Sequence, residues 1–354
     1  MEKITRRDFL KSASLIGMAG IIGFGSTSCI ENGSSKNLFV YNWPFYISDN
    51  VIKGFEQEFK IKITYDNYSS NEELLAKLHA GASGYDLIFP SDYMVAIMIN
   101  ENLLEELDLT KITNFKNLDE KFKNLSFDPN NRYSIPYLWG TSGIGYNKEN
   151  VTDKVLSWQI LWDEKYKDRI SMLDDVRSIA NPALKILGYS INTTDPGQIK
   201  EAKELLLKQK PLVKAYTSDT YVDFLKSGDV WLSEGYSGDV FQVIKEHKVI
   251  KYAIPEEGTE LWVDNMCIPR GSKNKESAEM FIDFLLRPEI SAEISNTTWY
   301  ANPNSASYKF INPEITKDKS IYPPQEIMDK CELLKDLGEA NKLYEALYNE
   351  LKST

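Results

Sequence analysis

Short apolar segments alternate with segments of helical periodicity over the part of the chain that begins near residue 38. Leu38–Asn42, Ile61–Asp66 and Asp86–Pro90 are short apolar runs that predict strands. Between them, Asp49–Lys60 carries apolar residues at helical spacing, and Ser70-Asn71-Glu72-Glu73 has the composition of a capping box that opens a helix. This rhythm predicts the α/β class, with a parallel sheet and helices on both of its faces.

The same alternation continues toward the C-terminus. Further strands are predicted at Gly143–Asn147, Ile170–Leu173, Leu212–Ala215, Val230–Ser233 and Val263–Pro269. Helices are predicted at Ile179–Leu187, Pro196–Lys208, Tyr221–Leu225, Asp239–His247, Lys275–Leu286, Glu289–Ser295 and Asp336–Leu351. A chain of 354 residues has room for two domains of ordinary size.

The first 28 residues have the pattern of an export signal. Arg6-Arg7 precede Phe-Leu-Lys, as in twin-arginine signals, and the apolar stretch from Ala13 to Phe24 is too short for a stable membrane-spanning helix. Ser26-Thr27-Ser28-Cys29 resembles a lipoprotein cleavage site, although Leu usually stands where Ser26 does. We therefore expect cleavage before Cys29, lipidation of Cys29 and a polar tether over residues 29–36. An uncleaved anchor or a signal without lipidation is the alternative.

Composition excludes several functional classes. The 52 acidic residues exceed the 41 basic ones, for a formal charge of −11, whereas a nucleic-acid-binding protein would present a basic face. The two His residues are not in metal-ligand spacing, and three Cys cannot form a four-thiolate zinc site. Phosphate-loop, nucleophile-elbow and zinc-protease motifs are missing after the signal. We expect no metal and no cofactor, and an enzyme is the least favoured class.

Aromatic residues and aspartates recur next to the predicted strands. Ligands of open α/β sheets bind at the carboxyl ends of the strands, so these positions are candidate site residues. They are Trp43, Tyr46, Ser91, Tyr93, Asp175, Tyr236, Asp239, Trp262 and Asp264, with Tyr300 after a helix. Each alone is explained as well by core packing or by a turn. Their repetition without Lys or Arg favours an organic cation, because aromatic faces and carboxylates bind such ligands.

Seven short motifs follow one another in an order that is typical of one protein family. They are Val40–Trp43, Tyr85–Ile88, Pro90–Tyr93, Asp128–Asn131, Ile135–Gly140, Trp262–Asp264 and Tyr300–Asn304. Together they resemble the spermidine/putrescine-binding proteins of bacterial ABC importers, and the resemblance extends from about Leu38 to Leu351.

The resemblance implies a two-lobed periplasmic-binding-protein fold. Each lobe would be a mostly parallel sheet flanked by helices, and a hinge would let the lobes close on putrescine and/or spermidine. Lobe 1 would comprise residues 37–140 plus 265–308, and lobe 2 residues 141–264 plus 309–354. The protein would deliver the polyamine to an ABC transporter permease from the periplasmic or cell-surface side. We expect a monomer that touches the membrane only through its lipid anchor and binds no nucleic acid.

The resemblance also implies roles for individual residues. An aromatic box would consist of Trp43, Tyr46, Tyr93, Tyr236, Trp262 and Tyr300. Asp264 would hold an amine, Asp175 would be a second acid, and Asp239 matches an acid of putrescine-type relatives. Ser91 and Ser218 would make polar contacts.

Some positions depart from the family pattern. Pro44-Phe45 replaces a hydroxyl–acid pair, Ser178 replaces a Glu, Leu334 replaces a Gln, and Tyr236 stands where relatives mostly carry Trp. These losses remove groups that grip a long triamine, while Asp239 and Asp264 remain for the two ends of a diamine. Putrescine is therefore favoured over spermidine.

Alternatives remain open for both the function and one residue. The chain could bind another organic cation or a neutral solute, present its ligand to a membrane receptor as a sensor, or be an exported enzyme. Glu234 would share a strand face with Tyr236, two residues later. It is either a further ligand carboxylate or a buried partner of a Lys or Arg.

Overall fold

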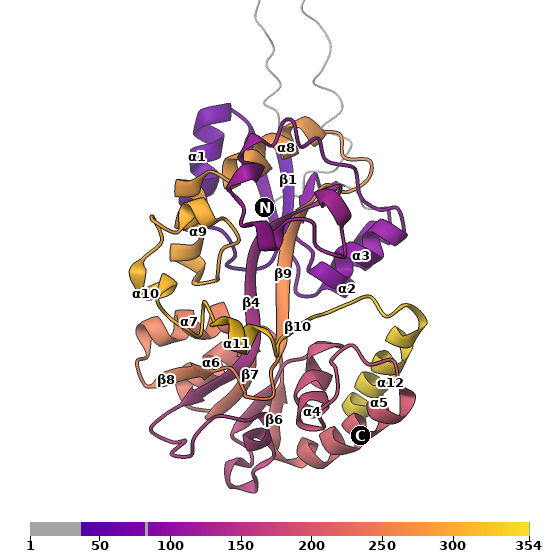
Figure 1. Ribbon diagram of the computed structural model, residues 1–354, viewed down its shortest axis with the longest axis vertical. Coiled ribbons are helices and arrows are strands. Elements are labelled where there is room, and N and C mark those ends of the chain that lie inside the picture. Colours follow the sequence, from indigo (N-terminus) through magenta and orange to yellow (C-terminus); the bar gives the residue numbers. More distant parts are fainter. Residues whose placement is uncertain (1–36, 82–83, 354) are drawn as a thin grey trace, which may run out of the picture. The chain divides into compact units, whose positions relative to one another are not determined.

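The computed structural model describes residues 37–81 and 84–353, and these contain one sheet of ten strands (Figure 1). The strands are β1 (Asn37–Asn42), β2 (Lys62–Asn67), β3 (Leu87–Ile88), β4 (Ser134–Asn147), β5 (Ile170–Met172), β6 (Val213–Tyr216), β7 (Leu232–Tyr236), β8 (Ile250–Ala253), β9 (Glu260–Cys267) and β10 (Glu332–Leu333). Their order is β2-β1-β3-β9-β4-β7-β5-β6, with β8 paired to β4 and β10 paired to β9.

Twelve α-helices lie in the same described residues. They are α1 (Asp49–Phe59), α2 (Asn71–His79), α3 (Asp92–Asn100), α4 (Asn181–Ile186), α5 (Pro196–Gln209), α6 (Tyr221–Ser227), α7 (Ser237–Glu246), α8 (Lys275–Leu285), α9 (Pro288–Thr298), α10 (Pro313–Thr316), α11 (Gln325–Met328) and α12 (Asn341–Ser353). Short 3-10 helices occupy several connections, among them Ser178–Ala180. The predicted alternation of strands and helices is confirmed.

The sheet has a parallel group of strands at each end and antiparallel strands between them. β1 pairs in parallel with β2 and β3, and β5 pairs in parallel with β6 and β7. β4 and β9 run antiparallel to each other between these groups, and each also pairs with a strand of one group (Figure 1). The two groups are therefore connected through the long strands β4 and β9.

The connecting strands are where the sequence prediction was inaccurate. The predicted strand Gly143–Asn147 is only the second half of β4. β9 begins at Glu260, so Trp262 and Asp264 lie within the strand. The sequence analysis had placed them next to the start of a strand. Both strands are buried along nearly their whole length, so they show no polar–apolar alternation. The strand β8 was not predicted.

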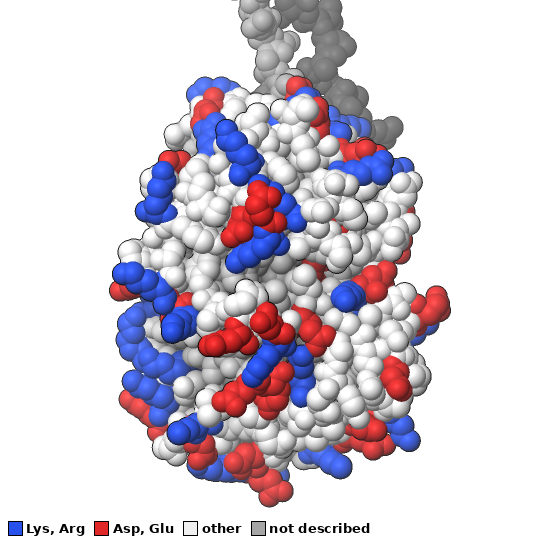
Figure 2. Space-filling view, viewed as in Figure 1, with Lys and Arg blue, Asp and Glu red and all other residues white. Residues whose placement is uncertain are grey.

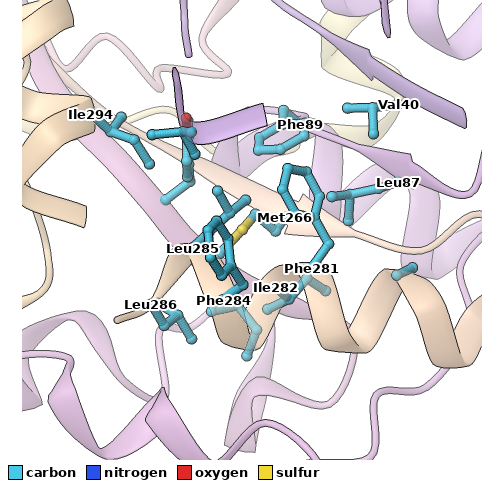
Figure 3. Close-up of a cluster of buried hydrophobic side chains, with 14 of the residues drawn as sticks. Val40, Leu87, Phe89, Met266, Phe281, Ile282, Phe284, Leu285, Leu286 and Ile294 are labelled. Atoms are coloured by element: carbon cyan, nitrogen blue, oxygen red, sulfur yellow. The ribbon is translucent and has the colours of Figure 1, made fainter. Parts of the chain in front are cut away.

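Aromatic packing fixes α8 and α1 on the first strand group. Figure 3 shows Phe281 and Phe284 of α8 close to side chains of the strands, including Val40 and Leu87. Phe55 of α1 packs on both phenylalanines, with ring centroids 4.7 Å from Phe281 and 5.5 Å from Phe284. This buried cluster supports the ends of β1 and β3, from which candidate site residues project.

We expect Phe281→Ala to lower the free energy of unfolding by about 3–5 kcal/mol, because it leaves a cavity beneath α8. The same substitution at Phe310, which is 41% exposed, should lower it by no more than about 1 kcal/mol. Urea unfolding of both variants measures the difference. Equal losses would contradict the assignment of Phe281 to the core.

Candidate ligand-binding site

Five aromatic side chains from separate parts of the chain form a continuous row. In order they are Tyr137 of β4, Tyr46 from the β1–α1 connection, Tyr300 after α9, Trp262 of β9 and Tyr236 at the end of β7. Successive ring centroids are 5.6, 5.2, 5.1 and 6.2 Å apart, and each pair meets edge to face. The structure thus brings together four of the six aromatic residues that the sequence singled out.

Asp264 lies beside this row and is almost completely buried. Its Oδ2 accepts a hydrogen bond of 2.7 Å from the Tyr46 hydroxyl, and its Oδ1 accepts one of 2.7 Å from Ser91. Burial raises the pKa of Asp264 to about 7, and these two hydrogen bonds oppose the shift. No Lys or Arg among the described residues forms an ion pair with Asp264, so the chain itself leaves this carboxylate without a cation.

Ser91 shows how the fold directs a side chain toward Asp264. Ser91 stands at the N-cap of α3, where a serine hydroxyl normally accepts a backbone hydrogen bond, but it makes no such bond here. The hydroxyl donates to Asp264 and accepts a 3.1 Å hydrogen bond from the Asn71 side-chain amide. The Asn71 Oδ1 accepts the Ser91 backbone N–H, so the serine is held from both sides.

Asp239 connects the row to α7, and both of its oxygens are engaged. Oδ1 accepts the Tyr300 hydroxyl at 2.6 Å, and Oδ2 accepts the Tyr221 hydroxyl at 3.0 Å. Burial raises the pKa of Asp239. The Tyr221 hydroxyl also accepts the backbone N–H of Tyr236. An ammonium at Asp239 would have to share these oxygens with two tyrosines, so Asp239 is less open to a ligand than the sequence suggested.

Trp43 and Tyr93 lie outside the row. The Trp43 indole N–H donates to the Phe89 carbonyl at 2.9 Å, so the ring is fixed at the end of β3. The Tyr93 hydroxyl donates to Glu72 at 3.0 Å. A cavity of about 380 Å³ opens beside Tyr93 and is lined also by Leu334 and Asp336.

Asp175 lies in the loop that follows β5, and Ser218 lies in the loop that follows β6. Asp175 Oδ1 accepts the backbone N–H groups of Arg177 and Ser178 at 2.9 and 2.8 Å. The Ser218 hydroxyl oxygen accepts the backbone N–H of Asp174 at 3.0 Å. Ser218 therefore supports the loop that carries Asp175, and among the described residues no hydrogen bond joins it to the aromatic row.

Two buried glutamates add to the acidic character of this region. Glu260 was missed by the sequence analysis, although it precedes Trp262 and Asp264 at intervals of two in β9 and so shares their strand face. Glu234 is fully buried, and its Oε2 accepts the Leu173 backbone N–H at 3.2 Å. Within the described residues Glu234 forms no ion pair with a Lys or Arg. The suggestion that Glu234 is the buried partner of a basic side chain is therefore not supported.

The outer surface has a different distribution of charge. On the face seen in Figure 2, basic and acidic side chains are interspersed. In the described part of the chain, these four acidic residues form no ion pair with Lys, Arg or His: Asp264, Glu234, Glu260 and Asp175. No group of three or more His, Cys, Asp or Glu there could hold a metal ion.

Residues 50–323 match the family model of the bacterial extracellular solute-binding proteins. The chain belongs to this family. It is 40% identical to the spermidine/putrescine-binding periplasmic protein of Escherichia coli K12 over 337 residues, which cover 95% of this chain and 97% of the relative. It is 36% identical to the putrescine/cadaverine-binding protein of Pseudomonas aeruginosa PAO1, over 90% of this chain and 94% of the relative.

Solved structures extend this result to the fold. A putative spermidine/putrescine ABC transporter protein from Listeria monocytogenes superimposes with a TM-score of 0.87 at 36% identity, covering 90% of this chain and 99% of the other. The predicted two-lobed α/β fold of this solute-binding protein is confirmed. We call the part built on β1–β3 the first lobe and the part built on β5–β7 the second lobe.

Family membership also places the protein outside the cytoplasm. In the described residues, no helix has both the length and the apolar character needed to cross a bilayer. The predicted export signal, Cys29 and the whole of the predicted tether lie outside the described residues.

Gly238 lets Tyr300 approach α7, and its replacement should disturb the row. A Cβ atom at Gly238 would lie 2.4 Å from the Tyr300 ring. We expect Gly238→Ala to lower the free energy of unfolding by about 1–3 kcal/mol, because the ring must move away from Asp239.

Gly54→Ala is the matched control for this variant. Gly54 also lies in a helix, but a Cβ there meets only Phe284 at 3.6 Å, an ordinary contact. We expect unchanged or slightly increased stability, since alanine favours a helix. Urea unfolding compares the two, and a Gly238→Ala variant as stable as Gly54→Ala would show that the ring contact is unimportant.

Proposed function

We propose that this solute-binding protein captures a polyamine of the putrescine and spermidine class between its two lobes and delivers it to an ABC importer. The observation that carries the proposal is Asp264, a buried carboxylate without a cationic partner in the described chain, set beside a row of aromatic rings. We further propose that the protein acts as a monomer, anchored by lipid at Cys29, and that it is a binding protein without enzymatic activity.

A ligand ammonium would complete the site electrostatically. Burying an ionised carboxylate is costly unless the charge is paired and hydrogen-bonded. Tyr46 and Ser91 supply two hydrogen bonds but no charge, and carboxylate oxygens can accept further donors. An ammonium would supply a positive charge and further hydrogen-bond donors. Each cation–π contact with the neighbouring rings would add about 0.5–2 kcal/mol.

These contributions are of the right size for a transport protein. A micromolar dissociation constant corresponds to about −8 kcal/mol, which two charge pairs and a few aromatic contacts can supply. A neutral solute would leave Asp264 unpaired, so the site selects for cations.

The relatives support this ligand class. They are named as spermidine/putrescine-binding and putrescine/cadaverine-binding proteins, and we extend that chemistry to this chain. The sequence-based preference for putrescine depended on Asp239 as the second acid, and Asp239 already accepts two tyrosine hydroxyls. We therefore propose putrescine and spermidine as the candidates and leave their order to the binding experiment.

We expect Asp264→Asn to weaken binding of every polyamine by at least about tenfold, because it removes the charge but keeps the side-chain shape. Calorimetry of residues 37–354 against putrescine, cadaverine, spermidine and spermine measures this. Asp49→Asn makes the same substitution at an exposed position and should bind as the unmodified protein does. If the unmodified protein binds none of the four, the polyamine proposal fails. If Asp264→Asn binds them undiminished, the site assignment fails.

Polyamine affinity should also depend on pH. The pKa of Asp264 is about 7 without ligand, and a bound ammonium would lower it, so the carboxyl must lose its proton for tight binding. Through Asp264 alone, affinity should therefore fall by about tenfold from pH 8 to pH 6, over the range in which this free carboxyl becomes protonated. Calorimetry in buffers of different ionisation enthalpy should show proton release. A smaller pH dependence is expected for Asp264→Asn, and a constant affinity in the unmodified protein would contradict the role of Asp264.

A further inference from the structure

Glu260 lies at the opposite end of the aromatic row from Asp264. Asp264 contacts Tyr46, whereas Glu260 accepts a hydrogen bond from Ser142, whose strand partner is Tyr236. Glu260 and Asp264 are four residues apart in β9, which places their Cα atoms about 13 Å apart along the strand. One strand therefore presents a carboxylate at each end of the row.

The two oxygens of Glu260 have different surroundings. Oε2 accepts three hydrogen bonds, from Ser142 at 3.2 Å, Ser178 at 3.0 Å and Asn181 at 2.8 Å. Oε1 accepts none from the described residues, yet it is not among the fully buried unpartnered atoms, so it retains accessible surface. The side chain is thus held firmly through one oxygen and leaves the other open to a donor.

Asp175 has the same arrangement and is joined to Glu260 through one residue. The Ser178 backbone N–H donates to Asp175 Oδ1 at 2.8 Å, while the Ser178 hydroxyl donates to Glu260. Asp175 Oδ2 accepts no hydrogen bond from the described residues. The Asn181 side chain is fully buried, and its Oδ1 lacks a donor. Three acceptors around Ser178 therefore lack a donor.

The basic residue nearest to this cluster does not neutralise it by contact. Arg177 directs its guanidinium to the carbonyl oxygens of Lys335 and Ile191, at 3.0 and 3.2 Å, and forms no ion pair with Glu260 or Asp175. Its charge lowers the pKa of Glu260, but burial and the Asp175 charge raise that pKa to about 7. The cluster keeps an excess of negative charge that a bound cation would offset.

Glu234 differs from Glu260 in accessibility. It has no accessible surface, and burial together with the charges of Glu260 and Asp175 raises its pKa well above the ordinary value. Both effects disfavour the ionised form of Glu234, and its side chain offers no surface to a ligand. Glu260 is the glutamate of the pair that a ligand can reach.

We propose that Glu260, together with Asp175, receives the second ammonium of the bound polyamine, while Asp264 receives the first. This inference rests on the proposed polyamine-binding function. It names Glu260 as the residue by which the site distinguishes a ligand with two or more ammonium groups from a ligand with one. A polyamine would lie along the aromatic row, with one charged end at each carboxylate of β9.

The test is calorimetry of Glu260→Gln and of its matched control Glu234→Gln, with putrescine and spermidine as ligands. Glutamine at 260 keeps an oxygen for Ser142, Ser178 and Asn181 but removes the charge. We expect Glu260→Gln to lose at least about tenfold in affinity for the polyamines that the unmodified protein binds. Glu234→Gln should lose less than about threefold, because Glu234 has no accessible surface through which a ligand ammonium could pair with it.

A second ligand separates pairing from structural support. Butylamine carries a single ammonium, and its affinity, measured by displacement of the bound polyamine, should change less than about threefold in Glu260→Gln. Equal losses of butylamine and polyamine, or equal losses in both glutamine variants, would assign Glu260 a structural role and overturn the inference. Unchanged polyamine affinity in Glu260→Gln would overturn it too, while leaving the proposed function intact. An unmodified protein that binds no polyamine would instead refute the proposed function.

Discussion

The cost of burying carboxylates without a cationic partner governs the chemistry of this protein. Asp264 and Glu260 lie on the same strand, are nearly inaccessible to water, and receive hydrogen bonds from neutral donors only. Neutral donors orient a carboxylate but do not offset its charge. The folded chain therefore holds buried negative charge that no side chain of its own offsets, and a cationic ligand would offset it.

The topology of the sheet makes such a site possible. β4 and β9 pass between the two strand groups, so β9 can present side chains at the junction, where both lobes contribute neighbours. Ser91 reaches Asp264 from 173 residues away in the chain, and Tyr300 reaches Asp239 from 61 residues away. The site is assembled from loops and strand ends that only the folded sheet brings together.

The sequence predicted the elements with strong periodicity and failed where burial removes it. α1 and α2 were found because their apolar spacing and caps are local; Ser70, for example, accepts the Glu73 backbone N–H as the capping box requires. β4 and β9 are buried on both faces, so their full lengths left no alternating pattern. Glu260 could have been found by the same two-residue rule that drew attention to Glu234. The engagement of Asp239 by Tyr221 and Tyr300 could not, because it depends on how α7 packs against the residues after α9.

The central claim is that a ligand ammonium replaces a proton at a buried carboxyl on β9. Difference infrared spectroscopy of the protein at about pH 6.5, with and without a bound polyamine, tests this directly. The account predicts that the band of protonated carboxyl groups weakens on binding while carboxylate bands grow, and that Asp264→Asn reduces the change. A polyamine that binds without altering the protonated-carboxyl band would contradict it.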